Sequence, residues 1–413
     1  MNLMLVIIIM AVLLVSTIIL YRDFMSPAIL MLIPWLISFV LLKYSDFYYA
    51  EADDSYAYIV IGIIFFQVAY FLSLKRKKNV NIYAIGKQKD TLYNELNING
   101  FFLISVSIIE TILLLIYELK LLKGSDTILA FEYVHQIAIT LFAIVLYLYF
   151  KLPKTHKNKA YLFIQMIPFT IALLLKTNGR AAYFQVAFML LFIYLSFNEY
   201  NNFLILKRFI QILLICVVLF IYVAIRKDHI EQGNIEYVLE QAVNWIIHYI
   251  SGSLVTFQKW FKACENEFQF GQNTFRIFFA IANRFISSHI KVVSTYFPFM
   301  KIGPRPESIA NVYTIYYTYI IDFGKVGGLI FQGILGWTYG YLYWKKESNQ
   351  MGAVLAFAFL IYPLMMQVFG DQYVALESGY LQIFLVYFIV HKCGFLYKKK
   401  NKMNGMKIRY LKF

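Results

Sequence analysis

Apolar segments long enough to cross a bilayer recur along almost the whole chain, and this feature limits the fold more than any other. The hydrocarbon core needs about 20 apolar residues per helix, and lipid offers no partner for an unpaired backbone group, so such segments must form helices. The chain of 413 residues is 61% hydrophobic and 15% charged, with a mean hydropathy of +0.63. The sequence therefore predicts an all-α polytopic membrane protein with eleven helices, at about residues 2–21, 24–42, 57–74, 100–122, 134–150, 161–176, 180–198, 209–225, 326–344, 351–369 and 379–396.

Two connections rich in basic residues predict the orientation of these helices. Residues 75–78 read KRKK and residues 151–159 read KLPKTHKNK. Lysine and arginine concentrate in cytoplasmic loops, so the N-terminus is expected outside and the C-terminus inside. The inner connections then hold 23 of the 38 lysines and arginines. The net charge of +15 is therefore attributed to loops that face anionic lipid, and no nucleic-acid partner is expected. Because residues 2–21 lack a basic leader, we expect a retained helix and not a cleaved signal.

One outer connection differs from all the others because it is about a hundred residues long. Residues 235–261 and 274–293 carry apolar side chains at helical spacing, which is typical of amphipathic helices that lie at a membrane surface. We expect these helices to pack over the outer ends of the bundle. The predicted organisation is helices 1–8 in residues 1–226, the outer loop in 227–325, helices 9–11 in 326–396, and a basic cytoplasmic tail in 397–413.

The turn KTNGRAAYFQ, residues 176–185, places Arg180 between two apolar segments on the predicted outer side. Asn178 and Gly179 form the turn, and Arg180 begins the next helix. Free N–H groups and a partial positive charge at a helix start, together with a guanidinium, favour phosphate binding. The alternative is an arginine that only reaches the lipid headgroups from a helix end.

The long outer loop adds further arginines on the side where positive charge is least expected. Arg276 and Arg284 are two helical turns apart, about 12 Å along the axis, and Arg305 follows. A guanidinium binds phosphate oxygens in a bidentate manner and keeps its charge, so a lipid pyrophosphate is a candidate ligand. Solvated faces and headgroup contacts are the alternative. His289 lies beside these arginines and is the first candidate for a general base.

The segment after the loop offers an acid and several tyrosines. Asp322 lies where the chain re-enters the membrane, next to a glycine, Gly324, that permits a turn. Tyr313, Tyr316 and Tyr317 share a helical face and could stack on sugars, or belong to an interfacial aromatic belt.

No metal site and no cofactor are predicted. Glu51 and Asp53 form an acid-x-acid pair in an outer loop, where a divalent ion could bind. Such pairs are common by chance, and outer loops are often acidic, so we expect no metal there.

Two segments together resemble the Wzy-type oligosaccharide repeat-unit polymerases of bacteria. NGRAAYFQVAFML is similar to a G-R turn of that family, and NVYTIYYTYIIDFGKVGGLIFQGILG is similar to its N-x-Y-T…D-F-G-x-x-G segment. Ser26, Pro27 and Trp35 resemble the second helix of its Gram-positive members. The R-x₁₀-G pattern of some members follows neither Arg180 nor Arg284, so no role of that pattern is carried over.

The resemblance implies a fold, a location and a reaction. It implies a bundle like that of O-antigen ligases and GT-C glycosyltransferases, in the bacterial cytoplasmic membrane. Repeat units on undecaprenyl pyrophosphate would be joined into capsular or O-antigen polysaccharide at the outer face, with a flippase and a chain-length regulator as partners. A ligase with the same donor, a transporter or flippase of lipid-linked sugars, and a membrane acyltransferase are the alternatives. The implied roles are pyrophosphate binding by Arg180, Arg276, Arg284 and Arg305, catalysis by His289 and Asp322, and sugar stacking by Tyr313, Tyr316 and Tyr317.

The charge distribution generates a prediction about sidedness. After replacement of Cys216, Cys264 and Cys393 with serine, a single cysteine at Lys262 should react with a membrane-impermeant thiol reagent on intact cells. A single cysteine at Lys77 should react only after lysis. Labelling at position 77 but not at position 262 on intact cells would invert the predicted orientation.

Overall fold

The computed structural model divides the chain into two compact units, one formed by Met1–Ile82 and Lys176–Leu381 and the other by Tyr83–Leu175 and Gln382–Phe413. The predicted helix at 100–122, most of those at 161–176 and 209–225, and the tail at 397–413 lie outside the described residues. The structure describes residues 1–45, 53–75, 139–151, 180–197, 235–263, 268–286, 297–303, 309–346, 350–375 and 377–392, with short pieces within 105–112, 159–167 and 202–221.

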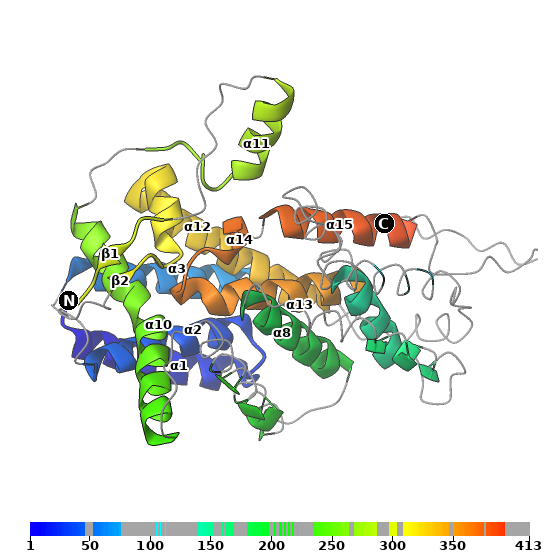
Figure 1. Ribbon diagram of the computed structural model, residues 1–413, viewed down its shortest axis with the longest axis horizontal. Coiled ribbons are helices and arrows are strands. Elements are labelled where there is room, and N and C mark those ends of the chain that lie inside the picture. Colours follow the sequence, from blue (N-terminus) through cyan, green and yellow to red (C-terminus); the bar gives the residue numbers. More distant parts are fainter. Residues whose placement is uncertain are drawn as a thin grey trace, which may run out of the picture. The chain divides into compact units, whose positions relative to one another are not determined.

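The described part of the chain is almost entirely helical. Its only strands are the two-residue β1 (Met300–Lys301) and β2 (Ile309–Ala310), which pair antiparallel with Met300 opposite Ala310. In the second unit, an apolar helix covers Ile139–Lys151. The labelled helices are α1 (Leu3–Tyr21), α2 (Pro27–Lys43), α3 (Asp54–Lys75), α8 (Arg180–Phe197), α10 (Ile235–Ala263), α11 (Arg276–Phe285), α12 (Tyr316–Lys346), α13 (Met351–Met365), the 3-10 turn η1 (Met366–Val368), α14 (Gln372–Ala375) and α15 (Glu377–Lys392), shown in Figure 1.

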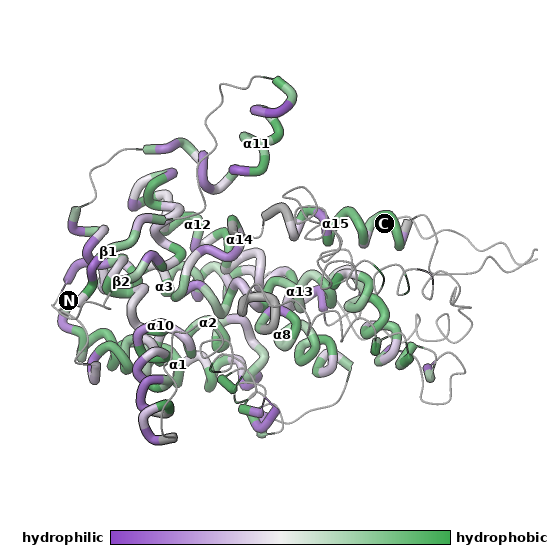
Figure 2. The backbone as a smooth tube through the Cα atoms, viewed as in Figure 1, coloured by the Kyte–Doolittle hydropathy of each residue, from purple (hydrophilic) through white to green (hydrophobic). Residues whose placement is uncertain are grey.

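Four of these helices are long and apolar enough to cross a membrane: Leu3–Tyr21, Asp54–Leu74, Tyr316–Lys346 and Met351–Val368. Apolar residues cover the length of α1 (Figure 2), and many of them are exposed, among them Ile8, Val12, Val15 and Ile19. An exposed apolar surface of this kind suits contact with lipid. The chain is therefore a helical membrane protein, as the sequence predicts, whereas the number of eleven spans stays a prediction.

The helix α12 is broken at Gly324. This glycine has φ 72° and ψ 177°, a backbone conformation that side chains other than hydrogen hardly allow. The rings of Tyr319 and Phe331 stack at 4.7 Å between centroids, whereas twelve residues of straight helix would separate them by about 18 Å along the axis. The helix therefore folds back on itself at Gly324. Its first part, at 316–323, belongs to the outer loop that was predicted to end at 325.

Glycines along α12 allow its second part to approach α3 closely. A Cβ on Gly328 would meet the Tyr58 hydroxyl at 2.4 Å, and one on Gly336 would meet the backbone oxygen of Phe66 at 2.2 Å. Small residues at such contacts let helix backbones pack in a membrane without bulky side chains between them. The contacts advance along both helices together, so α3 and the second part of α12 run in the same direction. The two helices therefore start on the same side of the bundle.

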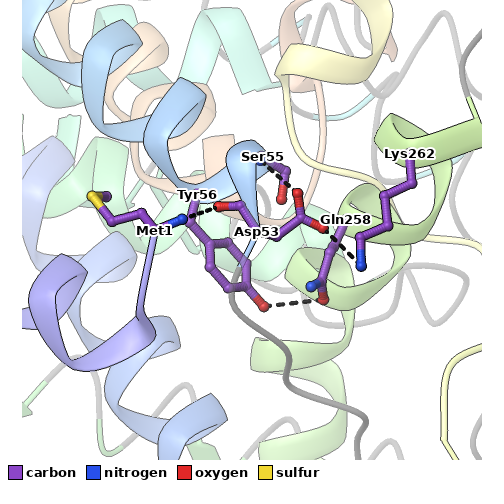
Figure 3. A network of polar contacts seen from close by, with 6 residues as sticks. All are labelled: Met1, Asp53, Ser55, Tyr56, Gln258 and Lys262. Carbon is purple, nitrogen blue, oxygen red and sulfur yellow. Dashed lines mark hydrogen bonds and ion pairs between the residues drawn. The ribbon is translucent and has the colours of Figure 1, made fainter.

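A polar network ties the start of α3 to α10, which crosses α2 and α3 at a steep angle (Figures 1 and 3). Asp53 forms an ion pair of 3.2 Å with Lys262 of α10. The Tyr56 hydroxyl donates to Gln258 at 3.1 Å, and the Met1 amine donates to the backbone oxygen of Asp53 at 2.9 Å. The predicted outer connections around Asp53 and Lys262 are thus in direct contact.

Near the end of α1 and the end of α12, a second set of contacts joins predicted inner connections. The Tyr343 hydroxyl, near the end of α12, donates to the carboxylate of Asp23. The Asn202 amide donates to the backbone oxygen of Arg22 at 2.9 Å. These contacts join predicted inner connections with one another, and the topology itself stays a prediction.

The break generates a prediction about stability. Gly324→Ala should destabilise the protein by about 1–3 kcal/mol, because alanine is strained at this φ and its Cβ would lie 2.5 Å from Phe268 Cε1. Gly333→Ala is the matched control in the same helix. Nothing lies within 4 Å of its added Cβ, and alanine is favoured over glycine inside a helix by roughly 0.5–1 kcal/mol.

Thermal unfolding of the purified protein in detergent, followed by fluorescence, would measure both changes. A Gly324→Ala protein that melts at the same temperature as wild type or Gly333→Ala would mean that α12 is a continuous helix.

Candidate functional site

The candidate site is built around Asp322, two residues before the break at Gly324 in α12. Its side chain is only 1% exposed. Oδ1 accepts hydrogen bonds from the backbone and side-chain nitrogens of Asn273, at 3.1 and 2.8 Å. Oδ2 accepts from the backbone nitrogen and the hydroxyl of Thr274, at 2.6 and 2.7 Å. Hydrogen bonds to a charged group contribute roughly 1.5–3 kcal/mol each, so this carboxylate is a strong anchor for the outer loop.

The anchored turn leads directly into α11, which carries two of the predicted arginines. Arg276 begins α11 two residues after Thr274, and Arg284 lies in its last turn. A further backbone bond, from Gln269 N to the oxygen of Ile321 at 2.9 Å, holds the same turn against α12. Asp322 therefore fixes where the arginine-bearing helix starts.

The helix α11 has two different faces. None of its residues is buried, and the large apolar side chains of Phe278 and Phe285 are 65% and 78% exposed. At 100° per residue these two rings lie nearly opposite Arg276 and Asn283. The helix is thus amphipathic, as the sequence predicts; Arg276 is half-buried on its polar face, and Arg284 is exposed about 80° around the helix from it.

The three candidate tyrosines are packed within the protein. Tyr313 and Tyr317 have ring centroids 4.3 Å apart, and Phe297 lies 4.6 Å from Tyr317. Tyr316 is completely buried, and its hydroxyl donates to the backbone oxygen of Ile59 at 3.1 Å. Their faces contact other rings in this structure, so a sugar-stacking role stays a prediction.

Trp35 connects two of the motifs that carry the family resemblance. It is fully buried in α2, and its ring centroid lies 5.8 Å from that of Tyr316. The helix α2 begins at Pro27, directly after Ser26. The Ser-Pro…Trp segment therefore packs against the start of the N-x-Y-T…D-F-G segment, although the two are far apart in the sequence.

A second buried carboxylate, Asp371, was not indicated by any sequence pattern. It follows Gly370, which has φ 143°, at the break between α13 and α14. Oδ1 accepts from the backbone nitrogens of Tyr373 and Val374 at 2.9 and 3.2 Å. Its position outside the predicted spans gave no reason to expect burial, but only 7% of it is exposed.

The surroundings of Asp371 keep the pKa of its carboxyl close to neutral pH. Its pKa is raised to about 7, chiefly by burial and in smaller part by the charge of Asp322. The backbone N–H groups and the nearby Tyr319 hydroxyl act in the opposite direction and lower it. A carboxyl with this pKa can give up or accept a proton near neutral pH, which is what a general acid or base requires.

The structure describes the remaining predicted site residues only in part. Arg180 is the first residue of α8, as predicted, and its side chain lies outside the described residues. His289 and Arg305 also lie outside them. Convergence of Arg180 with Arg276 and Arg284 on one pocket therefore stays a prediction.

Of the acid pair Glu51 and Asp53, the second residue has a structural role. Asp53 binds Lys262 through Oδ2 and accepts the backbone N–H of Ser55 through Oδ1 at 2.9 Å, which caps the start of α3. Glu51 lies outside the described residues. Within the part of the chain that the structure describes, no group of three histidines, cysteines or acids could hold a metal ion.

Comparison with known proteins gives no match of this chain to a protein-family model, to a curated protein or to a solved structure. The family resemblance therefore rests on the quoted motifs.

Proposed function

We propose that this protein is a glycosyltransferase of the bacterial cytoplasmic membrane that polymerises oligosaccharide repeat units carried on undecaprenyl pyrophosphate. The proposal includes the eleven-span topology, with the N-terminus and the loop at 227–325 outside and the C-terminus inside. The expected product is a polysaccharide of the capsular or O-antigen type. A flippase would deliver the repeat units, and a chain-length regulator would act on the product.

The observation that carries the proposal is the attachment of the arginine-bearing loop to the break in α12. Asp322 belongs to the D-F-G motif, and its four hydrogen bonds go to Asn273 and Thr274, in the turn that leads into α11. The motif and the arginines are therefore one structural unit. A helix break next to a fixed cationic helix supports the binding of an anionic lipid headgroup at the membrane surface.

The reaction needs few chemical groups. The acceptor hydroxyl oxygen attacks the anomeric carbon of the donor, and the bond from that carbon to the pyrophosphate breaks. Negative charge then grows on the leaving undecaprenyl pyrophosphate. Arg276 and Arg284 would stabilise this charge through their guanidinium donors, which bind phosphate oxygens in a bidentate manner.

A ligase with the same donor is the second candidate, because the same leaving group requires the same arginines. The two activities differ only in the acceptor. Lipid-linked repeat units alone give polymer with a polymerase, whereas a ligase needs a separate acceptor.

The proposal predicts that Arg276→Ala and Arg284→Ala each reduce polymer formation from purified lipid-linked repeat units by about ten- to a hundred-fold. The loss of one charge-assisted bond from the transition state costs roughly 1.5–3 kcal/mol. Lysine at either position should restore little activity, because it lacks the bidentate fork. Arg180→Ala is expected to behave in the same way.

Arg208→Ala is the matched control, since this exposed arginine donates to Gln211 at 3.0 Å on the predicted inner side. It should leave polymer length and yield unchanged at equal expression. If Arg276→Ala and Arg284→Ala also give normal polymer, these arginines only contact headgroups and the proposed function loses its support.

A further inference from the structure

Asp371 lies where two broken helices meet. The break at Gly370 separates α13 from α14, and a Cβ on Gly370 would lie 3.2 Å from the backbone oxygen of Tyr313. The backbone nitrogen of Ile315 donates to the oxygen of Gln367 at 2.9 Å. The chain just before α12 is thereby joined to the chain between α13 and α14.

This junction contains several buried polar side-chain atoms, near the Tyr319 and Tyr373 hydroxyls. Asp371 Oδ2, both polar side-chain atoms of Gln367 and the hydroxyl of Thr314 are buried without a hydrogen bond of ordinary geometry to described residues. Asp371 is 7% exposed, Thr314 is 1% exposed and Gln367 is fully buried. Buried polar groups are nearly always paired, so a set of such atoms in one place makes this junction a candidate polar site.

The two buried carboxylates of this region differ in their hydrogen bonding. Asp322 has donors on both oxygens, so its bonding capacity is used by the loop. Asp371 accepts backbone hydrogen bonds through Oδ1, whereas Oδ2 has no hydrogen bond of ordinary geometry and the Tyr319 hydroxyl lies nearby. Two neighbouring carboxyls in such different surroundings are typical of a site in which one acid has a structural or electrostatic role and the other exchanges a proton.

The titratable groups that face Asp371 come from three elements. Asp322 and Tyr319 approach from α12, Tyr373 from α14 and Tyr380 from α15. The groups that act on Asp371 in the described structure are thus an acid, tyrosine hydroxyls and backbone N–H groups. Such surroundings keep the pKa of the carboxyl at about 7, and Oδ2 can accept a hydroxyl proton.

We propose that Asp371 is the general base that activates the acceptor hydroxyl, an inference that rests on the proposed function. The O–H bond of the acceptor breaks and its proton moves to Asp371 Oδ2. The oxygen forms the new bond to the anomeric carbon, and the electron pair of the breaking C–O bond leaves with the polyprenyl pyrophosphate. Asp371 later releases the proton to water.

The test is the pH dependence of polymerisation by the purified full-length protein, with lipid-linked repeat units extracted from the producing cells. The wild-type rate should rise as Asp371 loses its proton around pH 7 and then level off. Asp371→Asn should lower turnover by about a hundred-fold or more, as expected for a lost general base. Its residual rate should lack the rise near pH 7, while binding of polyprenyl pyrophosphate stays at the wild-type level.

Two further variants separate chemistry from structure. Asp371→Glu keeps a carboxyl and should retain part of the turnover, with the rise displaced along the pH axis. Asp54→Asn removes an exposed acid from the first turn of α3 and should leave both rate and pH profile unchanged.

The outcomes distinguish the inference from the proposed function. Normal turnover and an unchanged pH profile in Asp371→Asn overturn the role of Asp371 and leave the polymerase intact. Loss of polyprenyl pyrophosphate binding together with turnover in Asp371→Asn, or an undisplaced profile in Asp371→Glu, shows that the residue only maintains structure. A wild-type protein that forms no polymer removes the proposed function and this inference with it.

Discussion

The bonding of the Asp322 carboxylate to the turn before α11 is the interaction on which the rest of the site depends. A buried carboxylate in a membrane protein is unfavourable unless it is fully paired, and here the pairing partners come from a segment 48 and 49 residues away in sequence. Folding of the outer loop onto α12 therefore satisfies the charge, and the charge in turn fixes the loop. The position of the arginines on α11 follows from this one contact.

The break at Gly324 makes that contact possible. Because the chain turns back at this glycine, the first part of α12 lies beside the second part, with Tyr319 stacked on Phe331. A continuous helix would carry Asp322 in line with the membrane span and away from the loop. The break at Gly370 brings Asp371 to the same region, so two acids with different surroundings share it. One acid holds the loop, and the other has an oxygen without a hydrogen bond of ordinary geometry and a pKa of about 7.

Local sequence patterns predicted the parts of this arrangement that depend on local chemistry. The helix start at Arg180, the amphipathic stretch that becomes α10 and the turn at Gly324 follow from residue type and spacing. The start of α12 at Tyr316 could not be predicted in this way, because its tyrosine-rich first part is held by contacts with distant rings such as Trp35. The partners of Asp322 and the burial of Asp371 are likewise set by tertiary packing, which leaves no periodic signal in the sequence.

Hydrogen–deuterium exchange of the full-length protein in lipid nanodiscs would test the anchoring of the outer loop most directly. The account predicts that the amides of Asn273 and Thr274, which donate to Asp322, exchange much more slowly than amides of an unstructured loop. In Asp322→Ala these two amides should lose their protection while the second part of α12, at 325–346, keeps its own. Rapid exchange at both amides in the wild-type protein, or equal protection in Asp322→Ala, would contradict the account.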